Sequence, residues 1–572
     1  VAEAAKAWLD VFMCKFPELQ GQAGKFDLMQ EMTWELFLEA LYAMPRGKAV
    51  GQSGFSVELL LAFPRGHEAQ RSFYDALMVD LRKQRTPSSW AVVVYALLVK
   101  GYPNDPNVVA ERRDIAIMEQ ALKLCMRMVR KISYQRMTGR IHGAQMGWVP
   151  GSGTGEVSVE LKHLVEQAAI AKHGLYILYI DLATFFPAID RRVLRMHEML
   201  HGLPKEVLDV VAAVYGSGDG DEDAVSCRYD MEAGLGGLFK CRMGALMGDV
   251  LSPDKAKLLL NSIIVALDVS VQGVRVWGAR PETVGEVWAT ITQMAFADDH
   301  AGAFTAEDEL QAAWLLWRSW AIAMGTKLGV KKKLKCAVTG VKRVGGVTSS
   351  VADPRLMMPN GEAVPFIKHY EWYKHLGKWT RADGRTIGCD KKQVMAKLKG
   401  ATNRLWKLKH VSREEFCMVA DVLLNGTAVF YGQTTYVTWK MADEAEASFR
   451  RVFNVKYGRV QNSARVELYH GVKPLRKHVW RGALAAQFTL ISDCMSGKEV
   501  TAQRLAARSS VAMAARRWGC RRDVLSWNFG YLREELYAHL EKADVTTLGE
   551  VWMLGAAVAR EQMTDEEKEG TG

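Results

Sequence analysis

The sequence has little that would tie the chain to an oxidising compartment or to a metal bound by sulfur. Its nine cysteines are an odd number, they are scattered over 572 residues, and no two form a Cys-x-x-Cys pair. No histidines stand at the spacing of a zinc finger. We therefore expect reduced thiols in an intracellular protein.

Long apolar runs are also missing. The longest, at 90–99 and 258–267, fall well short of the roughly 18 residues that a membrane-spanning helix needs. The first residues include Glu3 and Asp10, where a secretion signal has a basic start and an apolar block. We expect no membrane partner and, because the chain begins with Val1, a fragment that lacks its true start.

The remaining composition is that of a globular protein with a basic excess. Hydrophobic residues make up 49% and charged residues 24%, which excludes a disordered, collagen-like or coiled-coil chain. Lys and Arg number 75 against 64 Asp and Glu, so the net charge is +11 and the protein is not an acidic one. The length fits about three or four domains, or one large multi-lobed enzyme.

Apolar periodicity predicts alternating helices and strands. Helical spacing is expected within 1–45, 119–132, 159–172 and 307–324. Strands are expected at 89–100, again after the turn that follows it, and at 175–180. The last of these strands is expected to break at Asp181. A second strand pair, joined by an Asp-Asp turn, is expected within 287–305.

Three carboxylates are the strongest candidates for chemistry. Asp181 follows an apolar strand, and Asp298 and Asp299 occupy the tip of a predicted hairpin. If these elements are neighbours in one sheet, the like charges repel unless cations lie between them, as in a two-metal phosphoryl-transfer site. Taken separately, an Asp pair is more often a plain turn and a single Asp a helix cap.

Two segments are strongly basic. Residues 327–343 include seven Lys or Arg side chains and no acidic residue, and 450–481 are similarly biased. Such a run is usually a solvated surface, but the first one follows the carboxylates closely along the chain.

Eight short motifs follow one another between residues 45 and 458. They lie at 46–60, 90–115, 147–154, 181–186 (Asp-Leu-Ala-Thr-Phe-Phe), 244–253 (Gly-Ala-Leu-Met-Gly-Asp-Val-Leu-Ser-Pro), 296–299 (Phe-Ala-Asp-Asp), 325–332 and 373–377. In this order they resemble the reverse transcriptases of non-LTR (LINE-type) retrotransposons, where the fourth to seventh are motifs A to D and the last is the primer grip. Each match alone is within chance, whereas eight in order are not.

The resemblance implies an α+β fold with right-hand polymerase architecture, that is fingers, a palm with an antiparallel sheet, and a helical thumb. The implied domains are an N-terminal helical extension (1–44), fingers (45–174), palm with motifs A to D (175–370), primer grip and thumb (371–460), and a basic helical C-terminal extension with a frayed tail (461–572).

The resemblance also implies catalytic roles. Asp181, Asp298 and Asp299, with the backbone carbonyl of Leu182, would ligate two Mg²⁺ ions, for which Mn²⁺ can substitute. Lys332 would protonate the leaving pyrophosphate, although Lys331 and Lys333 remain alternatives.

Nucleotide contacts follow from the same resemblance. Lys100 and Arg113 would clamp the triphosphate, since phosphate favours such cations, although without motif context both read as solvated surface cations. Phe186 would be the bulky gate that collides with a 2′-hydroxyl, but either Phe185 or Phe186 must instead belong to the core. Met247 and Gly248 would line the nascent base pair.

The primer grip is implied at Tyr373, His375, Leu376 and Gly377. The following segment, 391–409 with Trp406, and then Tyr431 and Trp439, is expected to form a thumb that contacts the duplex phosphates.

Some positions depart from the family pattern. Met247 stands where the family has Gln, Asp114 and Val250 where it has Pro, and Gly329 where it has Asn. None of these is a metal ligand, so the departures leave the rate and the fidelity open.

The predicted function is therefore RNA-directed DNA synthesis, with an RNA template, dNTPs, and a DNA primer or nicked target DNA as partners. One alternative is a catalytically silent nucleic-acid-binding relic of such an element. Another is an RNA-templated RNA polymerase, which Ala297 and Phe186 disfavour, because that class prefers Gly and a small or polar residue there. The expected location is the nucleus, after a cytoplasmic ribonucleoprotein stage.

Overall fold

The computed structural model describes residues 1–17, 26–82, 90, 92–99, 112–149, 152–170, 173–216, 225–231, 234–277, 287–329, 335–345, 347–383, 389–432 and 439–457. Lys100, Lys332 with its neighbours Lys331 and Lys333, and the extension at 461–572 lie outside these residues.

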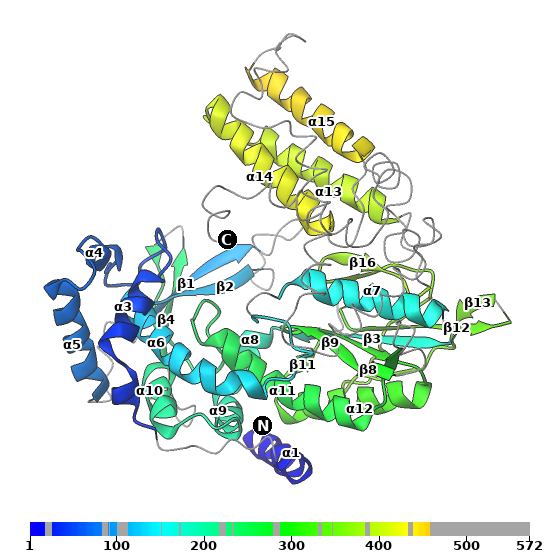
Figure 1. The fold of residues 1–572 in the computed structure, drawn as a ribbon, viewed down its shortest axis with the longest axis horizontal. Coiled ribbons are helices and arrows are strands. Elements are labelled where there is room, and N and C mark those ends of the chain that lie inside the picture. The colour runs from blue at the N-terminus through cyan, green and yellow to red at the C-terminus, as the bar shows by residue number, and fades with distance from the viewer. Residues whose placement is uncertain are drawn as a thin grey trace.

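Helices and strands are mixed along the chain, so the expected α+β class is confirmed (Figure 1). The helices are α1 (Ala2–Lys15), α2 (Leu28–Glu31), α3 (Trp34–Tyr42), α4 (Glu58–Leu61), α5 (Glu68–Arg82), α6 (Gln120–Met137), α7 (Thr154–Ile170), α8 (Phe185–Ala188), α9 (Arg191–Leu200), α10 (Lys205–Tyr215), α11 (Ser252–Ser270), α12 (Glu307–Ala323), α13 (Cys389–Trp406), α14 (Arg413–Gly432) and α15 (Trp439–Tyr457). The strands are β1 (Val92–Val99), β2 (Arg112–Ile117), β3 (Leu175–Ala183), β4 (Val225–Met231), β5 (Gly234–Leu235), β6 (Phe239–Cys241), β7 (Val274–Trp277), β8 (Val287–Ile291), β9 (Gln293–Phe296), β10 (Asp299–Phe304), β11 (Lys327–Leu328), β12 (Ala337–Val344), β13 (Val347–Ser350), β14 (Phe366–Ile367), β15 (Tyr373–His375) and β16 (Lys378–Thr380).

A seven-stranded sheet forms the centre of one half of the molecule. Its main strand order is β13-β12-β3-β10-β9, with β11 paired to β3 and β14 to β12. Alternate residues of β3 enter different cores, as a buried strand requires: Leu178 and Ile180 pack with α11 and α12, whereas Ile177 and Tyr179 pack with α7. The sheet is thus covered by helices on both faces (Figure 1).

A second sheet, β2-β1-β4-β5 with β6 on β4, forms the core of the other half. Its apolar face packs with α3, α5, α6 and α10 in a cluster of buried side chains that includes Phe37, Leu77, Met128 and Val211. The two strands predicted at 89–100 and after the turn that follows are present as β1 and β2, and they pair antiparallel.

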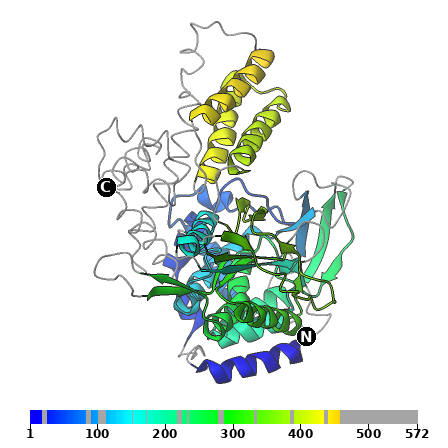
Figure 2. The same ribbon diagram turned by 90° about the vertical axis from the view of Figure 1, so that its right-hand side faces the viewer.

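A three-helix bundle, α13 to α15, stands apart from both sheets (Figures 1 and 2). Val394, Leu398, Ala401 and Leu405 recur at helical spacing on α13 and are buried against the other two helices. Phe416 lies at the centre of the bundle, with ring contacts to Phe449, Phe453 and Tyr457.

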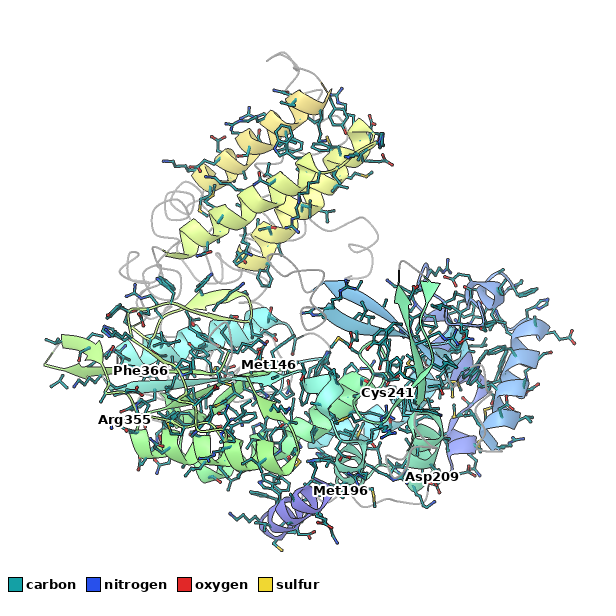
Figure 3. All side chains as sticks on the ribbon, turned by 180° about the vertical axis from the view of Figure 1, so that it is seen from behind. Met146, Met196, Asp209, Cys241, Arg355 and Phe366 are labelled. Carbon is teal, nitrogen blue, oxygen red and sulfur yellow. The ribbon has the colours of Figure 1, made fainter. Side chains whose placement is uncertain are left out.

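The first helix packs on the outside of the central sheet's helical layer. Leu9 and Phe12 of α1, with Phe16 just after it, form a cluster with Val265 and Ala266 of α11. Met196 of α9 also packs against this cluster (Figure 3). The helical character expected for 1–45 is therefore present in the described part of that region.

One local expectation was wrong. The sequence predicted that the strand at 175–180 would break at Asp181, but β3 continues to Ala183, because Leu182 and Ala183 pair with Leu328 and Lys327 of β11. The polar side chain of Asp181 therefore sits within a strand rather than at its end.

None of the helices in the described part of the chain is long and apolar enough to cross a membrane.

Candidate active site

The three predicted carboxylates meet at one end of the central sheet. Asp181 of β3 and Asp299 of β10 are direct partners in the antiparallel register, and Asp299 also pairs with Phe296 of β9. The loop between β9 and β10 is therefore only two residues long, Ala297 and Asp298. Directly opposed residues have Cβ atoms about 5 Å apart, so the sheet itself brings the carboxylates together.

The tight turn has an unusual backbone. Ala297 has φ +61°, and Asp298 is not among the described residues with positive φ. A positive φ at the first loop position alone is the pattern of a type II′ hairpin, where glycine is preferred because other residues are strained. Something other than residue preference must hold Ala297 in place.

Gln145 supplies that support, and the motif comparison missed it. Its buried Oε1 accepts hydrogen bonds from the backbone N–H groups of Ala297 and Gly147, each at 2.9 Å, and its Nε2 donates to the Ala297 carbonyl at 3.2 Å. A Cβ on Gly147 would lie 2.1 Å from the Ala297 nitrogen, so only glycine fits there. A glutamine two residues before the matched Gly147 was the available signal.

Burial and the repulsion between carboxylates raise the pKa values of Asp298 and Asp299. Burial, followed by the charges of Asp298 and Asp181, raises the pKa of Asp299 to about 7. The pKa of Asp298 is also raised, first by burial and then by Asp181, while Lys335 and Arg113 lower it. The three carboxylates thus repel one another, and a cation between them is favoured.

Lys335 is the described cation closest to the carboxylates. Its Nζ lies 2.7 and 2.8 Å from the two carboxylate oxygens of Asp181, whose side chain is only 13% exposed. The Tyr373 hydroxyl donates to the Lys335 carbonyl at 2.7 Å, which fixes the backbone of this lysine. Lys335 belongs to the basic segment that the sequence singled out, but Lys332 was the residue chosen there.

The chain on either side of Lys335 is pressed against Asp181. The Gly329 N–H donates to the Asp181 carbonyl at 2.8 Å, and the Cys336 thiol lies 3.4 Å from both the nitrogen and the carbonyl oxygen of Asp181. A Cβ on Gly329 would lie 2.8 Å from Asp181 Oδ2, so the family's Asn would not fit in this arrangement. The departure at Gly329 therefore has a local steric reason.

The predicted metal site consists of the three carboxylates and the Leu182 carbonyl. No group of three or more His, Cys, Asp or Glu side chains forms a ready-made metal site within the described ranges. The donor set nevertheless fits Mg²⁺, which prefers carboxylate oxygens, and the Asp181 oxygens already bind a positive charge, that of Lys335. Asp181, Asp298 and Asp299 are the residues that would hold the ions, with Leu182 next along β3.

Three predicted nucleotide contacts, Arg113, Met247 and Gly248, lie on or against strand β2. The exposed Arg113 of β2 is near enough to lower the pKa of Asp298. On the same strand, the Ala116 N–H donates to the Met247 carbonyl at 2.6 Å, and a Cβ on Gly248 would lie 2.7 Å from the Ala116 carbonyl. The second sheet and the loop of motif B are therefore joined next to the carboxylates.

The two phenylalanines of motif A have different surroundings. Phe185 is buried in the core, whereas Phe186 is half-buried and makes edge contacts with Phe185 and Trp148. The Phe186 carbonyl accepts a hydrogen bond from Ala245 at 2.9 Å, which ties it to the motif B loop. Phe185 is thus the core residue of the pair, and Phe186 is left as the candidate gate.

The predicted primer-grip residues form the hairpin β15–β16. Its two-residue loop, Leu376 and Gly377, has φ +49° and +80°, the type I′ pattern that matches the twist of a hairpin. Tyr373 stacks on Tyr179 with ring centroids 3.8 Å apart, and His375 is buried nearby. These two side chains are buried, whereas Lys374 is exposed and the loop residues are half-buried.

A comparison with models of known protein families and with curated proteins finds no match to this chain.

Proposed function

We propose that the protein is an RNA-directed DNA polymerase of the non-LTR retrotransposon type. The observation that carries this proposal is the pairing of Asp181 with Asp299 across β3 and β10, with Asp298 in the adjoining two-residue turn. The sequence resemblance predicted that the same three residues would act together. The half with the second sheet then corresponds to fingers, the central sheet to the palm, and α13–α15 to the thumb.

The chain's own residues would prepare the reaction in the following way. The three carboxylates would hold two divalent ions, which would supply activation of the primer 3′-hydroxyl and neutralisation of the leaving pyrophosphate. Arg113 binds the triphosphate of the incoming nucleotide. Lys335 would leave Asp181 and then donate a proton to the pyrophosphate.

The basic outer surface of α13 supports duplex binding. Lys397, Lys399, Arg404 and Lys407 are exposed there, and Trp406 is 42% exposed beside them. Phosphate contacts from such a surface give binding that does not depend on sequence. The bundle meets the primer-grip hairpin where Phe430 of α14 packs over Gly377 and Lys378.

The proposal of an RNA template and of dNTPs as substrates rests on the sequence resemblance and on Phe186 as the candidate gate. A purified protein should extend a DNA primer on an RNA template with dNTPs and Mn²⁺ or Mg²⁺. Extension with NTPs instead of dNTPs would favour the RNA polymerase alternative. Tight duplex binding without extension under either metal would favour the catalytically silent relic.

A further inference from the structure

The segment 144–148, which precedes α7, connects the carboxylate turn with the candidate gate. The Met146 N–H donates to the Ala295 carbonyl at 2.8 Å, and the Ala144 carbonyl accepts from Ala295 at 3.0 Å, so this segment runs beside β9. Met146 lies near the middle of the molecule (Figure 3). Two residues later, Trp148 turns away from β9 and reaches Phe186.

Trp148 is held in a conformation that its own preferences disfavour. Its φ is +58°, in the left-handed region that bulky residues seldom adopt. Its ring meets that of Phe186 edge to face, with centroids 5.6 Å apart and planes at 77°. Strain of this kind persists only where the surrounding structure imposes it, and it gathers at functional sites.

A buried ion pair contacts the backbone of Trp148. The Lys257 Nζ of α11 donates to the Trp148 carbonyl at 3.4 Å and lies 2.8 Å from the Asp254 carboxylate. Asp254 in turn binds Arg130 at 2.6 Å. The side chains of Lys257 and Asp254 are only 2% and 4% exposed, so water has little access to this ion pair.

We propose that Trp148 is a positioning residue that fixes the Phe186 ring and thereby sets the preference for deoxyribonucleotides over ribonucleotides. The inference rests on the proposed function. Without Trp148 the Phe186 ring would keep only its edge contact with Phe185, and a ring that can rotate would no longer exclude a 2′-hydroxyl. Trp148 supplies the second ring, and Lys257 holds the backbone that carries it.

The test is single-nucleotide extension of a primer on an RNA template, with kcat and KM measured for a dNTP and for the matching NTP. In Trp148→Leu, the dNTP-to-NTP ratio of kcat/KM should fall at least about tenfold, mainly because the KM for NTP falls. Trp148→Tyr keeps a ring edge and should restore most of the ratio. Trp8→Leu, on α1, is the matched control.

A double variant separates positioning from general damage. Phe186→Val should lose selectivity by itself, and adding Trp148→Leu should then change the ratio by less than about twofold, because the two residues act as a unit. If Trp148→Leu does not fold, Lys257→Met releases the same backbone and should lower the ratio in the same direction.

Equal losses for both nucleotides in Trp148→Leu, or an additive fall in the double variant, would overturn the inference without contradicting the proposed polymerase function. A wild-type protein that extends with neither nucleotide would instead overturn the proposed function, and the inference with it.

Discussion

Asp181 and Asp299 are opposed residues on neighbouring antiparallel strands, so the distance between their carboxylates is set by the hydrogen-bond register of β3 and β10. A slip of one residue would turn either side chain to the other face of the sheet. The register is fixed because alternate residues on both faces of β3 are buried in separate cores. The geometry of the candidate site is therefore a property of the whole sheet.

If Asp181 binds metal ions as proposed, Lys335 competes with them for its carboxylate. We expect Lys335→Met to bind Mn²⁺ more tightly, with a half-saturating concentration several-fold lower, because the ammonium no longer neutralises the carboxylate. Primer extension at saturating metal should slow at least about tenfold, since the proton donor is lost. A metal titration of extension measures both. Lys342→Met, an exposed lysine of β12, is the control, and unchanged metal dependence in Lys335→Met would contradict the assignment.

The Gln145 side chain should be essential to the carboxylate turn. Gln145→Met leaves the backbone groups of Ala297 buried without partners, which costs about 1–3 kcal/mol of unfolding free energy. Denaturant unfolding measures this loss. The half-buried Gln311, whose amide donates to the Pro354 carbonyl at 2.8 Å, gives a matched Gln→Met control far from the carboxylates. An equal loss in both variants would show that Gln145 has no special role.

Gly329 should tolerate no side chain. A methyl group there would displace the Asp181 carboxylate, so we expect Gly329→Ala to lower extension at least about tenfold while duplex binding stays unchanged. Gly400→Ala is the control, because a Cβ on that helical glycine meets nothing within 4 Å. It should stabilise the protein by about 0.5–1 kcal/mol. Full activity of Gly329→Ala would mean that Asp181 is not held as described.

Acid should destabilise the protein partly through His197. Burial, then the nearby His201, lowers the pKa of His197 from 6.5 to about 3. The unfolded chain therefore takes up this proton first, and the stability that the neutral ring contributes is lost as the pH falls from about 6.5 towards 3.

His197→Leu lacks that proton uptake, so its unfolding free energy should fall less between pH 7.5 and 4.5 than that of the wild type, by about 1–3 kcal/mol. Urea unfolding at the two pH values measures the difference. The exposed His67 provides a His→Leu control. Parallel pH dependence in the wild type and His197→Leu would contradict a buried neutral ring.

Much of this site could be predicted from the sequence, because the motif residues lie beside short apolar strands and a helix start that the local sequence alone indicates. The Asp pair stands between two short apolar strands, and Ser252 and Pro253 begin α11 as a helix start requires. The α+β class followed from the same periodicity.

The supporting residues could not be predicted, because their roles depend on contacts between distant segments. Gln145 and Ala297 are 152 residues apart, and Lys335 and Asp181 are 154 apart. The continuation of β3 through Asp181 likewise depends on β11, whose two residues carry no strand signal of their own. The basic run around Lys332 offered several equivalent lysines, and spacing alone could not choose among them.

The most direct test compares primer extension by the wild type, Asp299→Asn and Asp308→Asn, the last being an exposed residue in the first turn of α12. Binding of the RNA–DNA duplex is measured for each. The account predicts extension with Mg²⁺ or Mn²⁺ by the wild type and Asp308→Asn, and a loss of at least about a thousandfold in Asp299→Asn with duplex binding unchanged. Metal-independent extension, or equal activity in all three proteins, would contradict it.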